Sequence, residues 1–388
     1  MFYPFLSGNL GQYVIWRFSV QELSLFSSLR PAHVKMNSMK KNKPWYNNYP
    51  NSLNKAYALI NGFYNIRNKI DPNIVKTFYR EELASFLYES NNIEGEDIDL
   101  SNTTRVLNGI EGLEIIIKEI NQFDGLSHIY VTPNIIRKSK SIIKYNKKAK
   151  LDTMLYQQLQ AMSMSNFKAI MFLLSKAEIF LYKIKNKGKN GQSISKERPK
   201  LKSFLTLKNI KSIHRMISKN FLDDPEAYPG KFRTYPIMTG VNTNYPTSTY
   251  IKSLMQKYCK KSNKLLSISE MDPISAAAII STDFVNIHPF PDFNGRMSRI
   301  LLNSALHYHE YPFPISIRSD SKAKRKYLYS LRKTGNLQYK YISVLLANEI
   351  IDQIERLNKT LKIYGKKQIK EDWDYFKEYE TLDGTIFS

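Results

Sequence analysis

Residues His288–Arg299, with the sequence His-Pro-Phe-Pro-Asp-Phe-Asn-Gly-Arg-Met-Ser-Arg, place a base, a metal ligand and two arginines in one short segment. A histidine side chain has an ordinary pKa of about 6.5, so His288 is a candidate general base at cellular pH. Asp292 supplies hard oxygen ligands that suit Mg2+. Arg296 and Arg299 would project from the same face of a helix toward one anion. This combination predicts phosphate chemistry.

Asn294 and Gly295 favour the unusual backbone angles that turn successive N–H groups toward an anion. The residues that follow, Arg296 to Leu306, predict a helix whose N-terminus would face the same anion. The central predicted helix, Ala276 to Ile287, is so apolar that it must lie in the core and present His288 at its end.

The segment resembles the signature of the Fic (Fido) family, HPFxDGNGRxxR. Eight of the nine specified positions match, and Phe293 departs from the family's Gly or Ala. The resemblance covers about residues 75–122 and 203–350. It implies a mainly α fold, a Fic (Fido) helical domain with a small β-hairpin flap beside the active site.

The resemblance implies a protein adenylyltransferase that moves AMP from ATP to a Ser, Thr or Tyr hydroxyl of a target protein. His288 would be the general base and Asp292 would hold Mg2+ between the α- and β-phosphates. Asn294 and Gly295 would cradle the phosphates, while Arg296 and Arg299 would take the outer ones. Further nucleotide contacts implied by the resemblance are Phe293 in the same loop, Thr239, Gly240, Val241 and Asn242 in the flap, and Tyr327 near the adenine.

Residues Ser90-Asn91-Asn92-Ile93-Glu94-Gly95 resemble the family's inhibitory motif, [S/T]xxxE[G/N], in which Ser90, Glu94 and Gly95 are the specified positions. The resemblance implies that Glu94 forms a bidentate ion pair with Arg299. This pair would remove the partner of the ATP γ-phosphate. The closest overall likeness is to animal and fungal Fic enzymes, in which the same glutamate also permits removal of AMP.

Phe293 raises a question about the loop, because a non-glycine residue at positive φ is strained and its ring could crowd the phosphates. A negative φ would instead leave the anion site intact. Three alternatives to adenylyl transfer therefore remain open: a Fic enzyme that mainly removes AMP, a nucleotide-binding pseudoenzyme that acts as a scaffold, and a basic nucleic-acid-binding protein.

Local patterns divide the chain into five predicted parts. Asp71-Pro72 and Asp272-Pro273 each pair a capping side chain with proline at the first helical position, which predicts two helix starts. Phe232 to Thr239 and Tyr245 to Ile251 predict two short extended arms of a hairpin. The parts are a poorly structured tail (1–50), N-terminal helices with the inhibitory helix (51–122), a basic helical insertion or linker (123–202), the Fic core (203–365) and a C-terminal tail (366–388).

Several more helices are predicted from apolar spacing and helix-start signals. Their expected ranges are Thr103 to Ile120, about Asp152 to Ile184, Leu207 to Ile217, Tyr327 to Arg332 and Tyr339 to Ile363.

The net charge of +24 is uneven, because residues 137–202 hold seventeen Lys and Arg against three acidic residues, which gives +14. Aromatic residues are not interleaved with these charges as in a nucleic-acid module, so a solvated insertion is favoured over a patch for RNA, membrane or acidic protein. Nucleic acid is therefore disfavoured as a partner. A protein substrate is expected, and a homodimer is compatible with the sequence.

Cys259 is the only cysteine, so the 388-residue chain forms no internal disulfide and no cysteine-based metal cluster is expected. Polar residues interrupt the apolar N-terminal segment before about 20 apolar residues accumulate, so no transmembrane segment is expected. A cytoplasmic location is favoured. Organellar targeting by residues 1–35, or a true start at Met36, are the alternatives.

Overall fold

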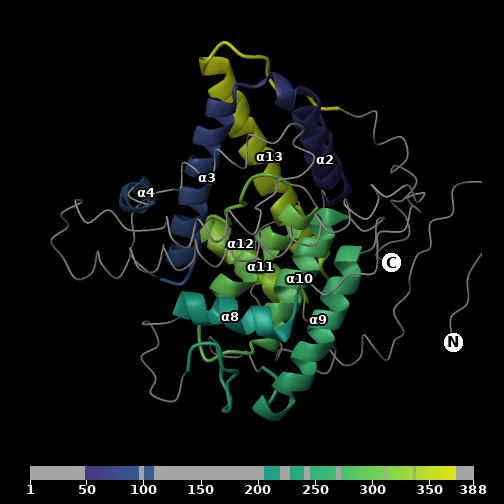
Figure 1. The fold of residues 1–388 in the computed structure, drawn as a ribbon. Coiled ribbons are helices and arrows are strands. Elements are labelled where there is room, and N and C mark those ends of the chain that lie inside the picture. Colours follow the sequence, from purple (N-terminus) through teal and green to yellow (C-terminus); the bar gives the residue numbers. More distant parts are fainter. Residues whose placement is uncertain are drawn as a thin grey trace, which may run out of the picture.

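The protein is described by a computed structural model, in which residues 49–95, 100–108, 205–218, 228–239, 245–267, 272–309, 311–334 and 338–372 are placed. These residues are mainly helical, as the sequence predicts (Figure 1). Residues 1–48 of the predicted tail 1–50 and the basic segment 137–202 lie outside the described residues, as does the predicted helix Thr103 to Ile120 beyond Asn108. Residues 49 and 50 begin helix α2.

Helices α10 (Pro273–Ile287) and α11 (Asn294–Tyr308) form the centre of the molecule, joined by the loop that carries His288. Ala276, Ala277 and Ala278 of α10 are fully buried. Side chains this small allow neighbouring helices to approach closely. Nearly every residue of both helices is buried, which explains why the α10 sequence is mainly apolar. The predicted apolar core helix is therefore confirmed.

The N-terminal helices α2 (Tyr49–Ile66) and α3 (Pro72–Ile93) lie beside the C-terminal helix α13 (Lys340–Ile363), and α4 (Leu100–Asn108) lies on the outer side of α3 (Figure 1). The remaining helices α8 (Leu207–Ser218), α9 (Ile251–Ser267) and α12 (Ser321–Thr334) surround the central pair. Short 3-10 helices cover Arg67–Lys69 and Ser248–Tyr250.

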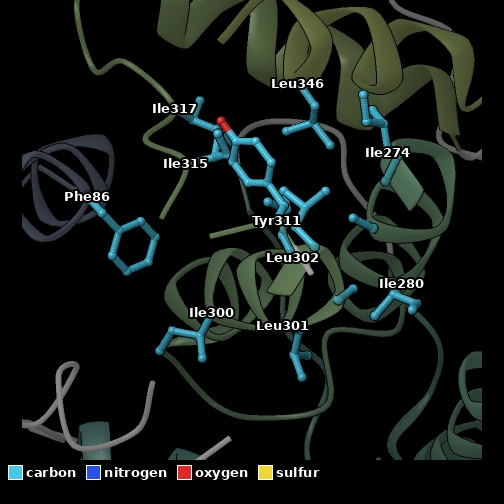
Figure 2. Packing of buried hydrophobic residues seen from close by; sticks show 14 of the residues in the cluster. Phe86, Ile274, Ile280, Ile300, Leu301, Leu302, Tyr311, Ile315, Ile317 and Leu346 are labelled. Atoms are coloured by element: carbon cyan, nitrogen blue, oxygen red, sulfur yellow. The ribbon is translucent and has the colours of Figure 1, made fainter. Parts of the chain in front are cut away.

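One apolar core unites these elements. Figure 2 shows residues from α3, α10, α11, the segment after α11 and α13 packed together, among them Phe86, Ile280, Leu302, Ile315 and Leu346. Burial of a large apolar side chain stabilises a fold by roughly 1.5–3 kcal/mol, so this shared core fixes α3 against the central pair.

Both predicted proline caps are confirmed. The Asp71 carboxylate accepts a hydrogen bond from the Asn73 N–H at 2.8 Å and starts α3. The Asp272 carboxylate accepts from the N–H groups of Ile274 and Ser275 at 3.0 and 3.2 Å and starts α10. These caps set the first turn of the two helices that carry Glu94 and His288 at their other ends.

One prediction needs correction. The segment Tyr245 to Ile251 is not an extended arm, because Ser248–Tyr250 is a 3-10 helix and α9 begins at Ile251. Its β-branched and aromatic residues favour a strand locally, but Ile251, Leu254, Met255 and Tyr258 continue as the buried face of a helix. Within the described residues, Met238 alone forms a β bridge. Residues 240–244, which connect the two predicted arms, lie outside the described residues.

The first residues of the predicted C-terminal tail (366–388) pack against α2. Ile369 is buried, and the Asp372 N–H donates to the Ala58 carbonyl of α2 at 3.0 Å. A side chain at Gly62 would lie 1.7 Å from the Lys370 carbonyl oxygen, so glycine is required where this segment crosses α2.

Candidate active site

His288 lies at the C-terminal end of α10 in a left-handed conformation, with φ 50° and ψ 60°. Its backbone N–H donates to the Phe284 carbonyl at 3.0 Å, and its ring Nδ1 lies 3.0 Å from the Val285 carbonyl oxygen. A carbonyl oxygen only accepts, so Nδ1 carries the proton and Nε2 keeps its lone pair in the neutral ring. Burial lowers the pKa of His288 to about 4. The ring is therefore neutral at cellular pH, with Nε2 able to accept a proton.

Arg233 holds the backbone around His288. The side chain is 3% exposed, and its Nε donates to the His288 carbonyl at 2.8 Å. Its two terminal nitrogens donate to the carbonyls of Tyr235 at 3.0 Å and Pro246 at 2.5 Å. Its backbone N–H donates to Pro289 at 3.0 Å. The two sides of the flap segment are residues 235–239 and residues 245–250. The Arg233 guanidinium joins both of them to the loop that follows α10.

His214 of α8 packs against the loop that follows α10 and carries Phe290 and Asp292. Its ring is stacked on Phe290, with centroids 3.7 Å apart. The Gly230 N–H donates to Nδ1 at 2.9 Å, so the proton resides on Nε2, which donates to the Asp292 carbonyl at 3.1 Å. Burial lowers the pKa of His214 to about 4, which favours this neutral form. Phe290 is fully buried and anchors the loop in the core.

Asp292 is exposed at the tip of the loop, directly before α11. Its Oδ1 accepts from the Phe293 N–H at 2.5 Å, which orients the carboxylate. Within the described residues there is no group of three His, Cys, Asp or Glu side chains that could hold a metal ion. A single accessible carboxylate nevertheless fits Mg2+, which is commonly bound by one or two carboxylates together with substrate phosphates.

Phe293 has φ 63°, so the strained backbone expected from the sequence is present. Its ring is not placed to crowd an anion, however, because Phe293 is 2% exposed and lies against the core. Its edge meets His214, with centroids 6.3 Å apart, and the Arg296 guanidinium carbon lies 3.9 Å from its ring centroid. The ring therefore packs beneath the loop and supports Arg296.

The N-terminus of α11 is built around Asn294 and Gly295. The Asn294 side chain accepts from the Phe290 N–H at 3.0 Å and donates to the Phe290 carbonyl at 2.8 Å, which closes the loop. A side-chain carbon at Gly295 would lie only 2.2 Å from Glu94 Oε1. The Glu94 carboxylate thus occupies the position beside the helix N-terminus where an anion is stabilised by the helix dipole.

Arg299 is 2% exposed and is bound by the end of α3. Its Nε donates to Ser90 Oγ at 2.9 Å, and one terminal nitrogen donates to the Ser90 carbonyl at 2.7 Å and to Glu94 Oε1 at 2.6 Å. The expected pairing of Glu94 with Arg299 is present. It is not the bidentate pair expected, because Ser90 takes up part of the donor set.

The charges of this pair stabilise each other. Burial alone would raise the pKa of the Glu94 carboxyl, but Arg299, with smaller help from Arg296 and His288, holds it below its ordinary value. Burial alone would lower the pKa of Arg299, and Glu94 raises it. Glu94 is therefore an anion and Arg299 a cation throughout the physiological range. Gly95 follows with φ 95°, which ends α3 beside the pair.

The other predicted nucleotide contacts are only partly placed. Tyr327 of α12 is buried and hydrogen-bonded to Arg299, so it lies at the anion end of the site. Arg296 is 4% exposed. Thr239 Oγ1 lies 2.5 Å from the Tyr245 hydroxyl in the flap segment. Gly240, Val241 and Asn242 lie outside the described residues.

Sequence reasoning missed the contributions of Arg233, His214 and Tyr245 to this site. Arg233 lies in the arm predicted for Phe232 to Thr239. Two of its acceptors, the His288 and Pro246 carbonyls, are distant along the chain, and no spacing pattern reveals them. His214 lies within the predicted helix Leu207 to Ile217. A histidine on the apolar face of that helix is the sequence signal that could have indicated its role.

Residues 204–306 match the family described as Fic/DOC family. The chain is 35% identical over 103 residues to a Fido domain-containing protein of Dictyostelium discoideum, covering 26% of this chain and 69% of that protein. The chain belongs to the Fic/DOC family. It is also 32% identical over 134 residues to a protein adenylyltransferase Fic of Drosophila ananassae, covering 34% of this chain. The matched part spans 26% of that relative's length.

Solved Fic structures share the fold. A Fic domain containing signaling protein from Bacteroides thetaiotaomicron aligns with a TM-score of 0.53 at 18% identity, over 81% of this chain and 99% of that chain. Fic-1 (residues 134–508) from C. elegans aligns with a TM-score of 0.50 at 19% identity, over 81% of this chain and 73% of that chain. In the described part of this Fic protein, no helix is long and apolar enough to cross a membrane.

Proposed function

We propose that this protein is an adenylyltransferase that transfers AMP from ATP to a Ser, Thr or Tyr hydroxyl of a target protein, and that Glu94 inhibits it through Arg299. The observation that carries the proposal is the position of the Glu94 carboxylate, which contacts Arg299 at 2.6 Å and lies against Gly295 at the N-terminus of α11. A carboxylate held at this place is a substitute for a phosphate group. The family membership and the adenylyltransferase relatives support the same reaction.

His288 is the general base in this proposal. Its Nε2 accepts the proton of the attacking hydroxyl as the hydroxyl oxygen bonds to the α-phosphorus of ATP. The bond from the α-phosphorus to the bridging oxygen breaks, and pyrophosphate leaves with the electron pair. The α11 N-terminus and the guanidinium groups of Arg296 and Arg299 stabilise the charge on the phosphates. Mg2+ held by Asp292 would neutralise part of that charge.

Removal of AMP from a modified target is the second candidate, favoured by one observation. The charge of Glu94 acts on both Arg299 and His288, so its carboxylate lies within electrostatic reach of the base. In this reaction Glu94 orients a water molecule. The water oxygen bonds to the phosphorus, the bond from the phosphorus to the target oxygen breaks, and a proton of the water passes to that oxygen, which leaves as a hydroxyl. If neither reaction is found, the protein is a nucleotide-binding scaffold without enzymatic activity.

Labelling with ATP radioactive at the α-phosphate tests the proposal. We expect Glu94→Gly to label itself or added protein at least tenfold more strongly than wild type, since Arg299 is then available to the γ-phosphate. Glu94→Gly combined with His288→Ala is expected to lose the label. Glu89→Gln is the matched control, because Glu89 lies on the same helix and binds the Ser319 N–H at 2.6 Å instead of Arg299. Equal labelling of Glu94→Gly and wild type would contradict the inhibitory role.

A further inference from the structure

The ring of Tyr245 covers one face of the His288 imidazole. The ring centroids are 4.0 Å apart and the planes are inclined by 27°, which is a stacked arrangement. Tyr245 belongs to the flap segment, whereas His288 ends α10, so the contact joins two elements that are distant in the sequence. Stacked aromatic pairs stabilise each other beyond the apolar area that they bury.

Tyr245 is held at two points. The Arg233 guanidinium donates to the carbonyl of Pro246, the next residue in the chain, at 2.5 Å. The same guanidinium donates to the His288 carbonyl at 2.8 Å, so one side chain fixes the backbone under both rings. At the other end of the ring, the Tyr245 hydroxyl lies 2.5 Å from Thr239 Oγ1. The stacking geometry is therefore built by fixed neighbours.

The imidazole is consequently restricted in two ways. The Nδ1–H donates to the Val285 carbonyl at 3.0 Å, which fixes the edge of the ring, and Tyr245 fixes its face. A rotation of the ring by about 180° about the Cβ–Cγ bond would exchange Nδ1 with Cδ2 and Nε2 with Cε1, and it requires the imidazole to leave the stack. Nε2 therefore stays directed away from the helix end.

We propose that Tyr245 is a positioning residue for the general base, holding the His288 ring so that Nε2 faces the hydroxyl that attacks ATP. This inference rests on the proposed function. It assigns the effect to the aromatic ring of Tyr245 and not to its hydroxyl, because the ring makes the contact with His288 and the hydroxyl is directed to Thr239.

The charged and titratable groups that act on His288 come from three elements: Glu94 at the end of α3, Arg233 before the flap, and Tyr245. Glu94 favours the protonated ring and Arg233 disfavours it, and both act in addition to burial, which is the largest influence on the His288 pKa. Removing the Tyr245 ring exposes one face to water. It should therefore raise the pKa of His288 from about 4 toward its ordinary value.

The kinetic test compares variants at Tyr245 in the Glu94→Gly background. We expect Tyr245→Leu to lower kcat about tenfold with less than a twofold change in KM for ATP, because a misplaced base affects the chemical step. Tyr245→Phe should stay within about threefold of the parent. The matched control is Tyr250→Leu, since Tyr250 lies in the same segment and is 64% exposed. A change in KM alone, or equal losses in Tyr245→Phe and Tyr245→Leu, would overturn the proposal.

Histidine NMR gives a readout that does not depend on catalysis. The signal of His288 is assigned by its absence in His288→Gln. In the wild-type protein we expect the Nδ1–H tautomer with a pKa well below 6.5, and in Tyr245→Leu a mixture of tautomers and a higher pKa. A wild-type His288 that titrates near 6.5, or unchanged spectra in Tyr245→Leu, would contradict the positioning role. The wild-type result does not depend on whether the variant folds.

The two experiments separate the inference from the proposed function. If Glu94→Gly transfers no AMP while the NMR results are as expected, the proposed function fails and the contact between Tyr245 and His288 stands. If transfer occurs and Tyr245→Leu leaves both kcat and the spectra unchanged, the proposed function stands and the role of Tyr245 fails.

Discussion

At the scale of single residues, Phe293 shows how a local strain can coexist with useful packing. Its φ of 63° is costly for a residue with a side chain, by about 1–2 kcal/mol. Its ring is buried between His214 and Arg296, and loss of a buried phenylalanine ring costs roughly 3–5 kcal/mol. The packing outweighs the strain. The sequence raised the question whether the Phe293 ring crowds the phosphates, and its buried position directs it into the core instead.

Two substitutions at Phe293 separate these effects. Phe293→Ala and Phe293→Gly both lose the ring, but only the alanine variant keeps a side chain at positive φ. We expect both to be less stable than the wild type and the glycine variant to be more stable than the alanine variant by about 1 kcal/mol. Urea unfolding of the three proteins measures the difference. An alanine variant as stable as the glycine variant would show that the backbone relaxes at this position.

At the scale of elements, α3 is important because it carries Glu94 at its end. An ionic cluster between a buried carboxylate and an exposed arginine fixes its middle to α13: the Arg356 guanidinium donates to both oxygens of Glu82 at 2.9 and 2.8 Å. Gln353 donates to Glu82 at 2.9 Å and accepts from the Tyr311 hydroxyl at 2.5 Å. Glu82 is only 4% exposed, so its charge depends on these partners. The helix that holds Glu94 is thus connected to the longest helix of the described part of the chain.

Arg356→Met tests this connection. The substitution leaves the Glu82 carboxylate buried without its cation, so we expect a loss of roughly 3 kcal/mol in the free energy of unfolding and faster hydrogen exchange in α3. Lys55→Met is the control, because Lys55 pairs with Glu355 at 3.5 Å and both side chains are exposed. If the two variants are equally stable, the cluster does not hold α3.

An element could be predicted from the sequence where the residues that form it interact with close neighbours in the chain. The caps at Asp71 and Asp272 are local, and both helix starts were predicted from adjacent residues. Helix α9 was missed because its first turn resembles a strand, although its buried residues repeat with helical spacing. The contacts of Arg233 and Tyr245 join segments far apart in the sequence, and no local pattern specifies them.

At the scale of the whole molecule, pH acts on stability through buried groups with opposite signs. Burial lowers the pKa values of His214, His288 and His307 to about 4, so their stabilising contribution is present above about 6.5 and is lost as the pH falls toward 4. Burial raises the pKa of Glu349 from 4.5 to about 7. Its contribution is present below 4.5 and is lost as the pH rises through 7.

Glu349→Gln isolates the second effect. The wild-type protein should lose stability from this group between pH 5 and pH 8, by about 2 kcal/mol, and the glutamine variant should not, because glutamine does not titrate. The measurement is the free energy of urea unfolding at both pH values. Glu355→Gln serves as the control, since Glu355 lies on the same helix with 52% of its side chain exposed. An equal pH dependence in wild type and Glu349→Gln would show that Glu349 is ionised without cost in the folded protein.

The position of Glu94 against Gly295 has a consequence for how the proposed inhibition responds to the cell. An anion attached to the chain has an effective concentration at its binding position that can reach the millimolar range, whatever the dilution of the protein. In the proposed inhibition, ATP competes with the Glu94 carboxylate, which is always present at the site. Neither a change in enzyme amount nor a modest rise in nucleotide alters the ratio of inhibited to ATP-bound protein. The rate of modification would then be set by whatever displaces the end of α3, so a signal that reaches this helix controls the output more directly than supply of the substrate.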